Sequence, residues 1–255
     1  MPRSATRPRS STRADRSGCA SCARSSTSSR ATGTSAREQP RASAERVSLG
    51  ILGGTFNPPH RGHLLVAGSA RTQLALDRVV LMPADVPPHK LGGEEPGAAH
   101  RLSMCRLAVA EAHGISACGL ELERGGASYT VDTLEAIHAK EPQAHLTFIA
   151  GADTARTLGS WREPQRVLEL AELAVATRTG SGRREVLDAL GAVTALEPDR
   201  QARVRFLSMP AIEMSSSMVR ERVARGEPID ELVGPSVASY IAEHRLYRAR
   251  VGAAR

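Results

Sequence analysis

The stretch "LGILGGTFNPPHRGHL", residues 49–64, decides the fold, because it joins a buried strand to a helix through a tight loop. The run "LGIL" is apolar and predicts a strand, which Gly53 and Gly54 end. Two prolines, a third glycine and two histidines, His60 and His63, follow. A turn needs glycine or proline but has no use for two histidines three residues apart. The stretch therefore predicts a loop that bends sharply, approaches a ligand and carries hydrogen-bond donors.

We expect the helix to begin at His63, with Gly62 letting the chain pass close to a ligand just before it. The N-terminus of a helix carries unpaired N–H groups and the positive end of the helix dipole, so it suits a phosphate group. His60 and His63 would add two donors on the same side. The plainer interpretation, in which one histidine caps the helix and the other packs in the core, stays open.

Outward from this stretch, short apolar runs alternate with amphipathic helical patterns. This alternation predicts an α/β fold, a Rossmann-like doubly wound parallel sheet followed by C-terminal helices. In such folds ligands bind at the carboxyl ends of the strands, near the switch point of the sheet. The predicted strands are 48–52, 78–84, 145–151, 172–178 and 204–210. The predicted helices are 63–76, 100–113, 130–140, 164–171, 183–190, 215–226 and 235–247.

Charge is distributed unevenly along the 255 residues. Residues 1–46 hold ten arginines, no lysine and three acids, whereas the other 209 residues carry 24 basic and 24 acidic side chains. The formal net charge of +7 therefore belongs to the N-terminal extension, and the neutral remainder argues against a nucleic-acid partner. No run approaches the ~20 apolar residues that span a membrane, so we expect no membrane partner either.

We expect residues 1–46 to be a disordered Arg/Ser-rich extension and residues 47–248 to form one domain. The extension has almost no large apolar residues, so it cannot bury enough surface to offset the entropy of ordering. Three origins stay open. The translation start could be assigned too early, since Val47 opens the first strand and a valine codon can initiate; the segment could be a genuine flexible tail, or a transit peptide.

The four cysteines indicate neither a disulfide framework nor a metal site. Cys19 and Cys22 have CxxC spacing but lie in the low-complexity extension, without a second pair or a histidine nearby. Cys105 and Cys118 stand in apolar surroundings and are expected to be buried thiols. The sequence therefore indicates a cytoplasmic protein with reduced cysteines, and it leaves the oligomeric state open, a homo-oligomer included.

Several motifs, taken in order, resemble those of a known family. The HxGH element of "GGTFNPPHRGHL" resembles the signature of the α/β-phosphodiesterase-type nucleotidylyltransferases. With the later motifs, residues 48–248 resemble one branch, the nicotinate-nucleotide adenylyltransferases, so residues 47–248 are expected to be a nucleotidylyltransferase domain. The later motifs are "PPHK" (87–90), "SYTVDTL" (128–134), "FIAGADTARTLGSW" (148–161) and "MSSSMVRERV" (214–223).

The resemblance implies adenylyl transfer from ATP to nicotinate mononucleotide, giving deamido-NAD and pyrophosphate in NAD biosynthesis. The phosphate of the acceptor would attack the α-phosphorus of ATP directly, without a covalent enzyme intermediate. Such a transfer depends on alignment and charge neutralisation more than on a nucleophilic side chain. Mg²⁺ is the implied metal, held chiefly by phosphate oxygens and water, with Asp153 as its candidate protein ligand.

The resemblance also implies the residues that bind ATP. His60, His63 and Arg220 are the implied catalytic residues, with Arg220 stabilising the departing pyrophosphate. Ser215 is equally a natural helix N-cap, but an arginine in the first turn opposes the helix dipole and needs a reason such as phosphate binding. The implied ATP-binding residues are Gly53, Gly54, Thr55, Phe56, Gly62, Gly151, Asp153, Ser215 and Ser216.

Lys90 and Asn57 stand out by composition. The chain has 32 arginines but only two lysines, and Lys90 lies in a Pro/Gly-rich loop, 85–99, that is too long for a simple connection. A compact point charge there favours substrate binding over a solvated surface lysine. Asn57 is the only asparagine, at a position where the family often has aspartate, so no argument can rest on a negative charge there.

Selectivity for the acid substrate would come from the middle of the chain. By resemblance the indole of Trp161 stacks on the pyridine ring, and backbone N–H groups near Tyr129, Thr130 and Arg162 receive the carboxylate. A structural tryptophan that anchors a helix is the other interpretation. Asp132 and Asp153 are candidates for polar contacts with the substrates. The implied substrate-binding residues are thus Lys90, Tyr129, Thr130, Trp161 and Arg162.

Other functions are weighed against this one. Within the same chemistry the enzyme could accept nicotinamide mononucleotide as well, or use a different phosphate acceptor. A different class is a nucleotide-sensing regulator whose arginine-rich extension contacts DNA or RNA, but the extension has no helical apolar period. A class I tRNA synthetase, which shares an HxGH element, is excluded by length and by the missing lysine signature.

Overall fold

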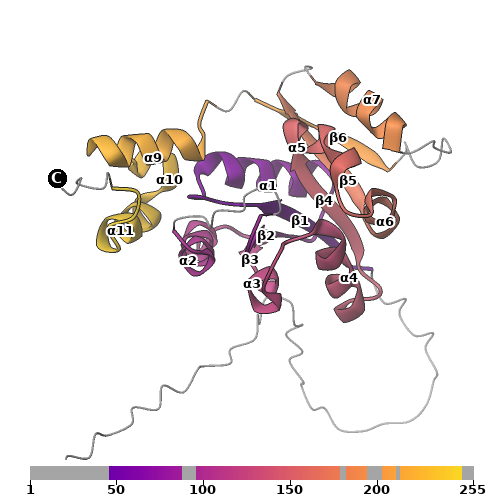
Figure 1. Cartoon of the computed structure of the whole chain (residues 1–255), viewed down its shortest axis with the longest axis horizontal. Coiled ribbons are helices and arrows are strands. Elements are labelled where there is room, and N and C mark those ends of the chain that lie inside the picture. The colour runs from indigo at the N-terminus through magenta and orange to yellow at the C-terminus, as the bar shows by residue number, and fades with distance from the viewer. Residues whose placement is uncertain (1–45, 88–95, 179–181, 194–202, 211–212, 249–255) are drawn as a thin grey trace, which may run out of the picture.

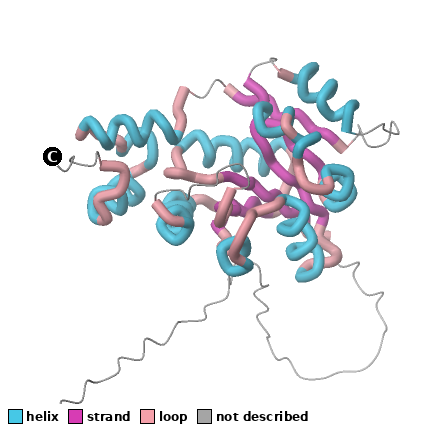
Figure 2. The backbone as a smooth tube through the Cα atoms, viewed as in Figure 1, coloured by secondary structure: helices cyan, strands magenta, loops and turns pink. Residues whose placement is uncertain are grey.

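Six parallel strands form one sheet in the order β3-β2-β1-β4-β5-β6 (Figures 1 and 2). The computed structural model describes residues 46–87, 96–178, 182–193, 203–210 and 213–248. The chain moves outward from β1 in one direction and then, starting with β4, in the other, so the switch point lies between these two strands. The strands are β1 (Ser48–Gly54), β2 (Arg78–Pro83), β3 (Ile115–Ala117), β4 (His145–Gly151), β5 (Glu172–Arg178) and β6 (Val204–Met209).

Helices cover both faces of the sheet, which explains why its strands are apolar on both sides. In β2, Val79 and Leu81 belong to the core under helices α1 and α2, whereas Val80 and Met82 belong to the core under α4 and α6. The predicted doubly wound sheet is therefore confirmed. These helices are α1 (Arg61–Gln73), α2 (Ala98–Val109), α4 (Thr130–Lys140) and α6 (Pro164–Leu170).

The C-terminal helices form a separate layer beside α2 (Figure 1). A third apolar core joins Met104 of α2 to Val219, Leu232 and Ile241 of this layer. The predicted helices near the C-terminus are therefore confirmed as a unit that packs on α2 instead of on the sheet. Its helices are α9 (Ser216–Arg225), α10 (Asp230–Val233) and α11 (Pro235–Glu243).

The predicted start of the first helix at His63 is wrong by two residues. His60 has an extended backbone (φ −142°, ψ 167°) and is the N-cap, so α1 begins at Arg61 and His63 lies within its first turn. The helix ends at Gln73, before Ala75 takes a left-handed φ of 50°. Of the short elements, α3 (Leu120–Arg124), α5 (Ala152–Arg156), η2 (Leu158–Ser160), α10 and β3 were not predicted, and α7 spans Arg183–Val193.

Cys105 and Cys118 are fully buried, as predicted. Residues 1–45, with Cys19 and Cys22, lie outside the described residues, as does the segment 88–95 that contains Lys90. Among the helices that the structure describes, none is long and apolar enough to cross a membrane.

Candidate active site

The loop that follows β1 folds back tightly on its own strand. A Cβ atom on Gly53 would approach the ring of Phe148 to 2.9 Å, so a larger residue at this end of the strand would have to displace that ring. Phe56 takes a left-handed φ of 49°, and its ring is buried edge-on to the ring of His63 at 4.9 Å. Phe56, predicted to bind ATP, thus lies beneath His63. The loop delivers His60 and His63 to the start of α1.

The two histidines form a tilted pair at the N-terminus of α1. Their ring centroids are 3.8 Å apart, and the backbone N–H of His60 donates to Nδ1 of His63 at 3.1 Å. Because Nδ1 accepts, the proton of a neutral His63 resides on Nε2. Burial lowers the pKa of His60 to about 4 and, with a smaller contribution from the charge of His60, lowers the pKa of His63 to about 3. Both side chains are therefore neutral donors at pH 7.

This burial makes the stability of the protein depend on pH through His60, whose side chain is only 8% exposed. The pKa is 6.5 in the unfolded chain and about 4 in the folded one, so between these values the unfolded state binds more protons. The free energy of unfolding therefore falls as the pH falls. Between these pKa values each pH unit changes the free energy of unfolding by about 1.4 kcal/mol. Protonation of His60 in the unfolded chain should therefore lower the free energy of unfolding by about 2 kcal/mol between pH 6.5 and pH 5.

Urea unfolding at pH 7 and pH 5 measures this loss in the wild type and in His60→Asn, whose side chain does not titrate. Burial, the main cause of the lowered pKa of His63, remains in the variant, so the difference between the two proteins comes chiefly from His60. The variant should lose about 2 kcal/mol less than the wild type. An equal loss in both proteins would contradict a buried, neutral His60.

Two neighbouring cavities open at the carboxyl ends of the strands and share Asp153. The first, of about 500 Å³, contains the histidine pair and the end of β4. The second, of about 480 Å³, contains the end of β1 and the start of α4. Of the predicted residues, the first cavity collects His60, Gly62, His63, Gly151 and Asp153. The second collects Gly53, Gly54, Thr55, Tyr129, Thr130, Asp153, Trp161 and Arg162.

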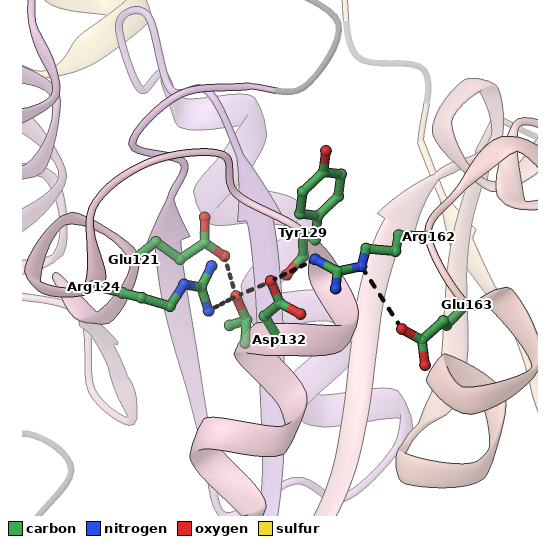
Figure 3. Close-up of polar contacts among 7 residues, drawn as sticks. Glu121, Arg124, Tyr129, Asp132, Arg162 and Glu163 are labelled. Atoms are coloured by element: carbon green, nitrogen blue, oxygen red, sulfur yellow. Dashed lines mark hydrogen bonds and ion pairs between the residues drawn. The ribbon is translucent and has the colours of Figure 1, made fainter.

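Arg162, at the wall of the second cavity, contacts an aromatic ring and two carboxylates (Figure 3). The guanidinium of Arg162 lies 5.0 Å from the centre of the Tyr129 ring. It also forms ion pairs with Asp132 at 3.4 Å and with Glu163 at 3.7 Å. Because α4 begins at Thr130, the unpaired N–H groups of its first turn lie at this wall. The arrangement offers backbone donors to an anionic group.

Trp161 is fixed at the same wall by two contacts. Its Nε1–H donates to Oγ1 of Thr157 at 3.1 Å, and its ring meets Phe148 edge-on with centroids 5.6 Å apart. Asp153, one turn before Thr157, has a side chain that is 91% exposed and paired with Arg156. The second cavity therefore has an anchored indole in its wall and an exposed carboxylate that it shares with the first cavity.

Glu121 is a buried acid of the second cavity that the sequence did not reveal. Its Oε1 accepts from the hydroxyl of Thr133 at 2.7 Å, and burial raises the pKa of its carboxyl against the effect of the Thr133 and Ser128 hydroxyls. Arg124 also reaches Thr133, at 3.4 Å. The glutamate thus anchors the turn that carries Tyr129 and Thr130.

Arg101 of α2 is a second residue that sequence reasoning missed. Its side chain is 1% exposed, and it donates to the backbone oxygen of Thr55 at 2.8 Å and to that of Asp85 at 2.9 Å. It thereby joins the loop after β1 to the loop after β2. The only signal in the sequence is that two buried apolar residues, Leu102 and Met104, follow it closely in the same helix.

Of the predicted phosphate contacts at α9, Ser216 and Arg220 contact the loop after β1, and none of the three lines either of the two cavities. Ser215 caps α9 by accepting from the N–H of Met218 at 3.2 Å. Ser216 donates to the backbone oxygen of Pro58 at 2.8 Å. Arg220 donates to the backbone oxygen of Asn57 at 2.8 Å and lines a third cavity, of about 630 Å³.

Comparison with known proteins indicates the family to which the chain belongs. Residues 51–222 match the family described as cytidylyltransferase-like. The chain is 40% identical over 200 residues to the probable nicotinate-nucleotide adenylyltransferase of Desulfitobacterium hafniense (strain DSM 10664 / DCB-2), over 78% of this chain and 95% of that protein. It is 39% identical over 199 residues to the protein of that name from Synechococcus sp. (strain JA-3-3Ab), over 78% and 94% of the two chains.

A solved structure shares the fold at lower sequence identity. It is that of Plasmodium falciparum nicotinic acid mononucleotide adenylyltransferase complexed with NaAD, with a TM-score of 0.60 and 18% identity, over 79% of this chain and 98% of that one. From the family match and the two bacterial relatives, the chain belongs to the cytidylyltransferase-like family and, within it, to the nicotinate-nucleotide adenylyltransferases.

Proposed function

We propose that this protein transfers the adenylyl group of ATP to nicotinate mononucleotide, giving deamido-NAD and pyrophosphate. The observation that carries the proposal is the pair of cavities that meet at Asp153, on the switch point of the sheet. One offers donors that suit phosphates, and the other offers an aromatic ring and backbone donors that suit a pyridine carboxylate. The bacterial relatives carry the name of this activity.

ATP would bind in the first cavity, with its phosphates over the start of α1. The N–H groups of the first turn and the Nε2–H of His63 supply donors to the phosphate oxygens. Because His60 and His63 are neutral, they contribute as dipoles fixed by packing and do not require protonation. Gly151, at the end of β4, lets the nucleotide approach the backbone.

Nicotinate mononucleotide would bind in the second cavity. The indole of Trp161 provides a face for the pyridine ring, and the backbone donors near Tyr129, Thr130 and Arg162 receive the carboxylate. A carboxamide in that place would set its own N–H groups against these donors. The site therefore favours the acid over the amide.

The two ligands then lie with the acceptor phosphate facing the α-phosphorus of ATP. An oxygen of the acceptor forms the new bond to the α-phosphorus as the bond to the leaving pyrophosphate breaks, so the enzyme needs no covalent intermediate. The residues of the chain align the reactants and neutralise charge. We assign Lys90 to substrate binding, and Ser215, Ser216 and Arg220 to the ATP phosphates or to the departing pyrophosphate.

Mg²⁺ fits the donors at the junction of the cavities. The carboxylate of Asp153 is exposed there, and hard oxygen donors are what this ion prefers. Among the described residues no group of three His, Cys, Asp or Glu side chains could hold a metal, so we propose phosphate oxygens and water as its other ligands. When bound, the ion neutralises phosphate charge. Since ATP and a mononucleotide are metabolites of the cytoplasm, we propose that compartment for the protein.

Pyrophosphate release by the purified chain tests the proposal. ATP and Mg²⁺ are offered with nicotinate mononucleotide or with nicotinamide mononucleotide, using the full chain and residues 47–255. We expect the acid to be preferred by at least about tenfold in kcat/KM, as one well-placed set of donors would give, and the shorter chain to be equally active. Equal use of both acceptors would contradict the proposed acid selectivity, and inactivity of a folded protein with both would contradict the reaction.

A further inference from the structure

Three side chains from the C-terminal layer hold two consecutive residues of the loop after β1. The hydroxyl of Ser216 donates to the backbone oxygen of Pro58, and Arg220 donates to that of Asn57, both at 2.8 Å. The third, Tyr247, donates from its hydroxyl to Oδ1 of Asn57 at 2.6 Å. The catalytic loop is thus attached to a layer that packs on α2 and not on the sheet.

The backbone that presents the side chain of Tyr247 to the loop has an unusual conformation. After α11 ends, Arg245 and Tyr247 both take left-handed φ angles, 53° and 59°, which are rare for bulky residues. The N–H of Leu246 donates to the oxygen of Ile241 at 3.0 Å, and its side chain packs on the third core. Such a conformation persists only where surrounding contacts determine it, and the bond to Asn57 is one of them.

The acceptor of this bond is well placed to influence the histidine pair. Asn57 is 7% exposed and follows Phe56, whose own φ is left-handed and whose ring supports His63. Three residues further on, His60 donates its backbone N–H to His63. Removing the donor of this buried hydrogen bond weakens the hold on the side chain of Asn57, so Asn57 would shift. The residues on either side of it would follow.

We propose that Tyr247 is a positioning residue for adenylyl transfer, acting through Asn57 on the placement of His60 and His63. The proposal rests on the function proposed above. It assigns the end of the C-terminal layer a role in the reaction although Tyr247 lines neither of the two cavities that meet at Asp153. The role concerns the ATP side, because His60 and His63 line the first cavity and are not among the residues that line the cavity of Tyr129 and Trp161.

Tyr247→Phe in the full chain tests the proposal, with Tyr240→Phe as a matched control. Tyr240 lies in the same layer, and its hydroxyl is hydrogen-bonded to Nδ1 of His100 at 2.9 Å instead of to the loop. We expect Tyr247→Phe to lower kcat about tenfold, because catalysis is sensitive to small displacements. The KM for nicotinate mononucleotide should stay within about twofold of the wild type, and Tyr240→Phe should leave both constants within that range.

Hydrogen exchange of the amides in residues 56–63 gives a second readout that does not depend on activity. Tyr247→Phe should exchange them about tenfold faster, and Tyr240→Phe at the wild-type rate. Unchanged kcat and unchanged exchange in Tyr247→Phe would overturn the proposal, as would equal losses in both variants. A wild-type chain that releases no pyrophosphate would instead refute the proposed function, and exchange would still decide whether Tyr247 holds the loop.

Discussion

Replacing His63 by alanine is expected to lower kcat/KM for ATP by about 10² to 10³-fold. The substitution removes the Nε2–H donor at the start of α1 and the acceptor that holds the backbone of His60. Under the proposed function, both losses fall where the phosphates of ATP would bind. Steady-state pyrophosphate release with saturating nicotinate mononucleotide measures the effect.

Two further variants separate loss of the donor from general damage. His63→Asn keeps an N–H donor on a shorter side chain, so it should recover part of the loss, about tenfold. His138→Ala changes an exposed histidine of α4 and should leave the rate unchanged. If His63→Ala stayed within tenfold of the wild type, the neutral histidine pair would not be the main donor to the phosphates.

The fold could be predicted from the sequence where local patterns agree with the packing. β4 and β5 have the predicted bounds because each is a continuous apolar run with a helical pattern on either side. β3 was not predicted because it has only three residues, and its pairing with β2 is a tertiary contact that leaves no periodic pattern in the sequence. The start of α1 was misplaced because His60, in an extended conformation, caps the helix in place of a residue that commonly does so.

The site could be predicted where its residues stand in the motifs, and less well where they stand elsewhere. The motifs supply residues to both cavities, but Arg101 and Glu121 belong to none of them. A charged residue in a helix normally faces solvent, so pattern alone predicts exposure for both. Arg101 is buried because the oxygens of Thr55 and Asp85 accept from it, and Glu121 because Thr133 donates to it. Such partners come from other elements and become known only with the fold.

Replacing Trp161 by alanine is expected to raise the KM for nicotinate mononucleotide about 30-fold while the KM for ATP stays within about twofold. Loss of one buried aromatic contact is worth about 2 kcal/mol at a binding site, which corresponds to that factor. The KM for ATP should change little because Trp161 does not line the cavity of the histidine pair. Trp161→Phe retains an aromatic face and should raise the KM only a few-fold.

The chain offers a direct readout and a control for this prediction. Trp161 is its only tryptophan, so nicotinate mononucleotide should quench the intrinsic fluorescence of the wild type without ATP present. Thr157→Val removes the hydrogen bond to the indole and leaves the ring in place. If Thr157→Val raised the KM for nicotinate mononucleotide as much as Trp161→Ala, the hydrogen bond that holds the indole would account for the effect, and stacking on the pyridine ring would not. If the acid substrate caused no quenching, the pyridine ring would lie away from Trp161, and the acid site would have to be sought elsewhere along the wall.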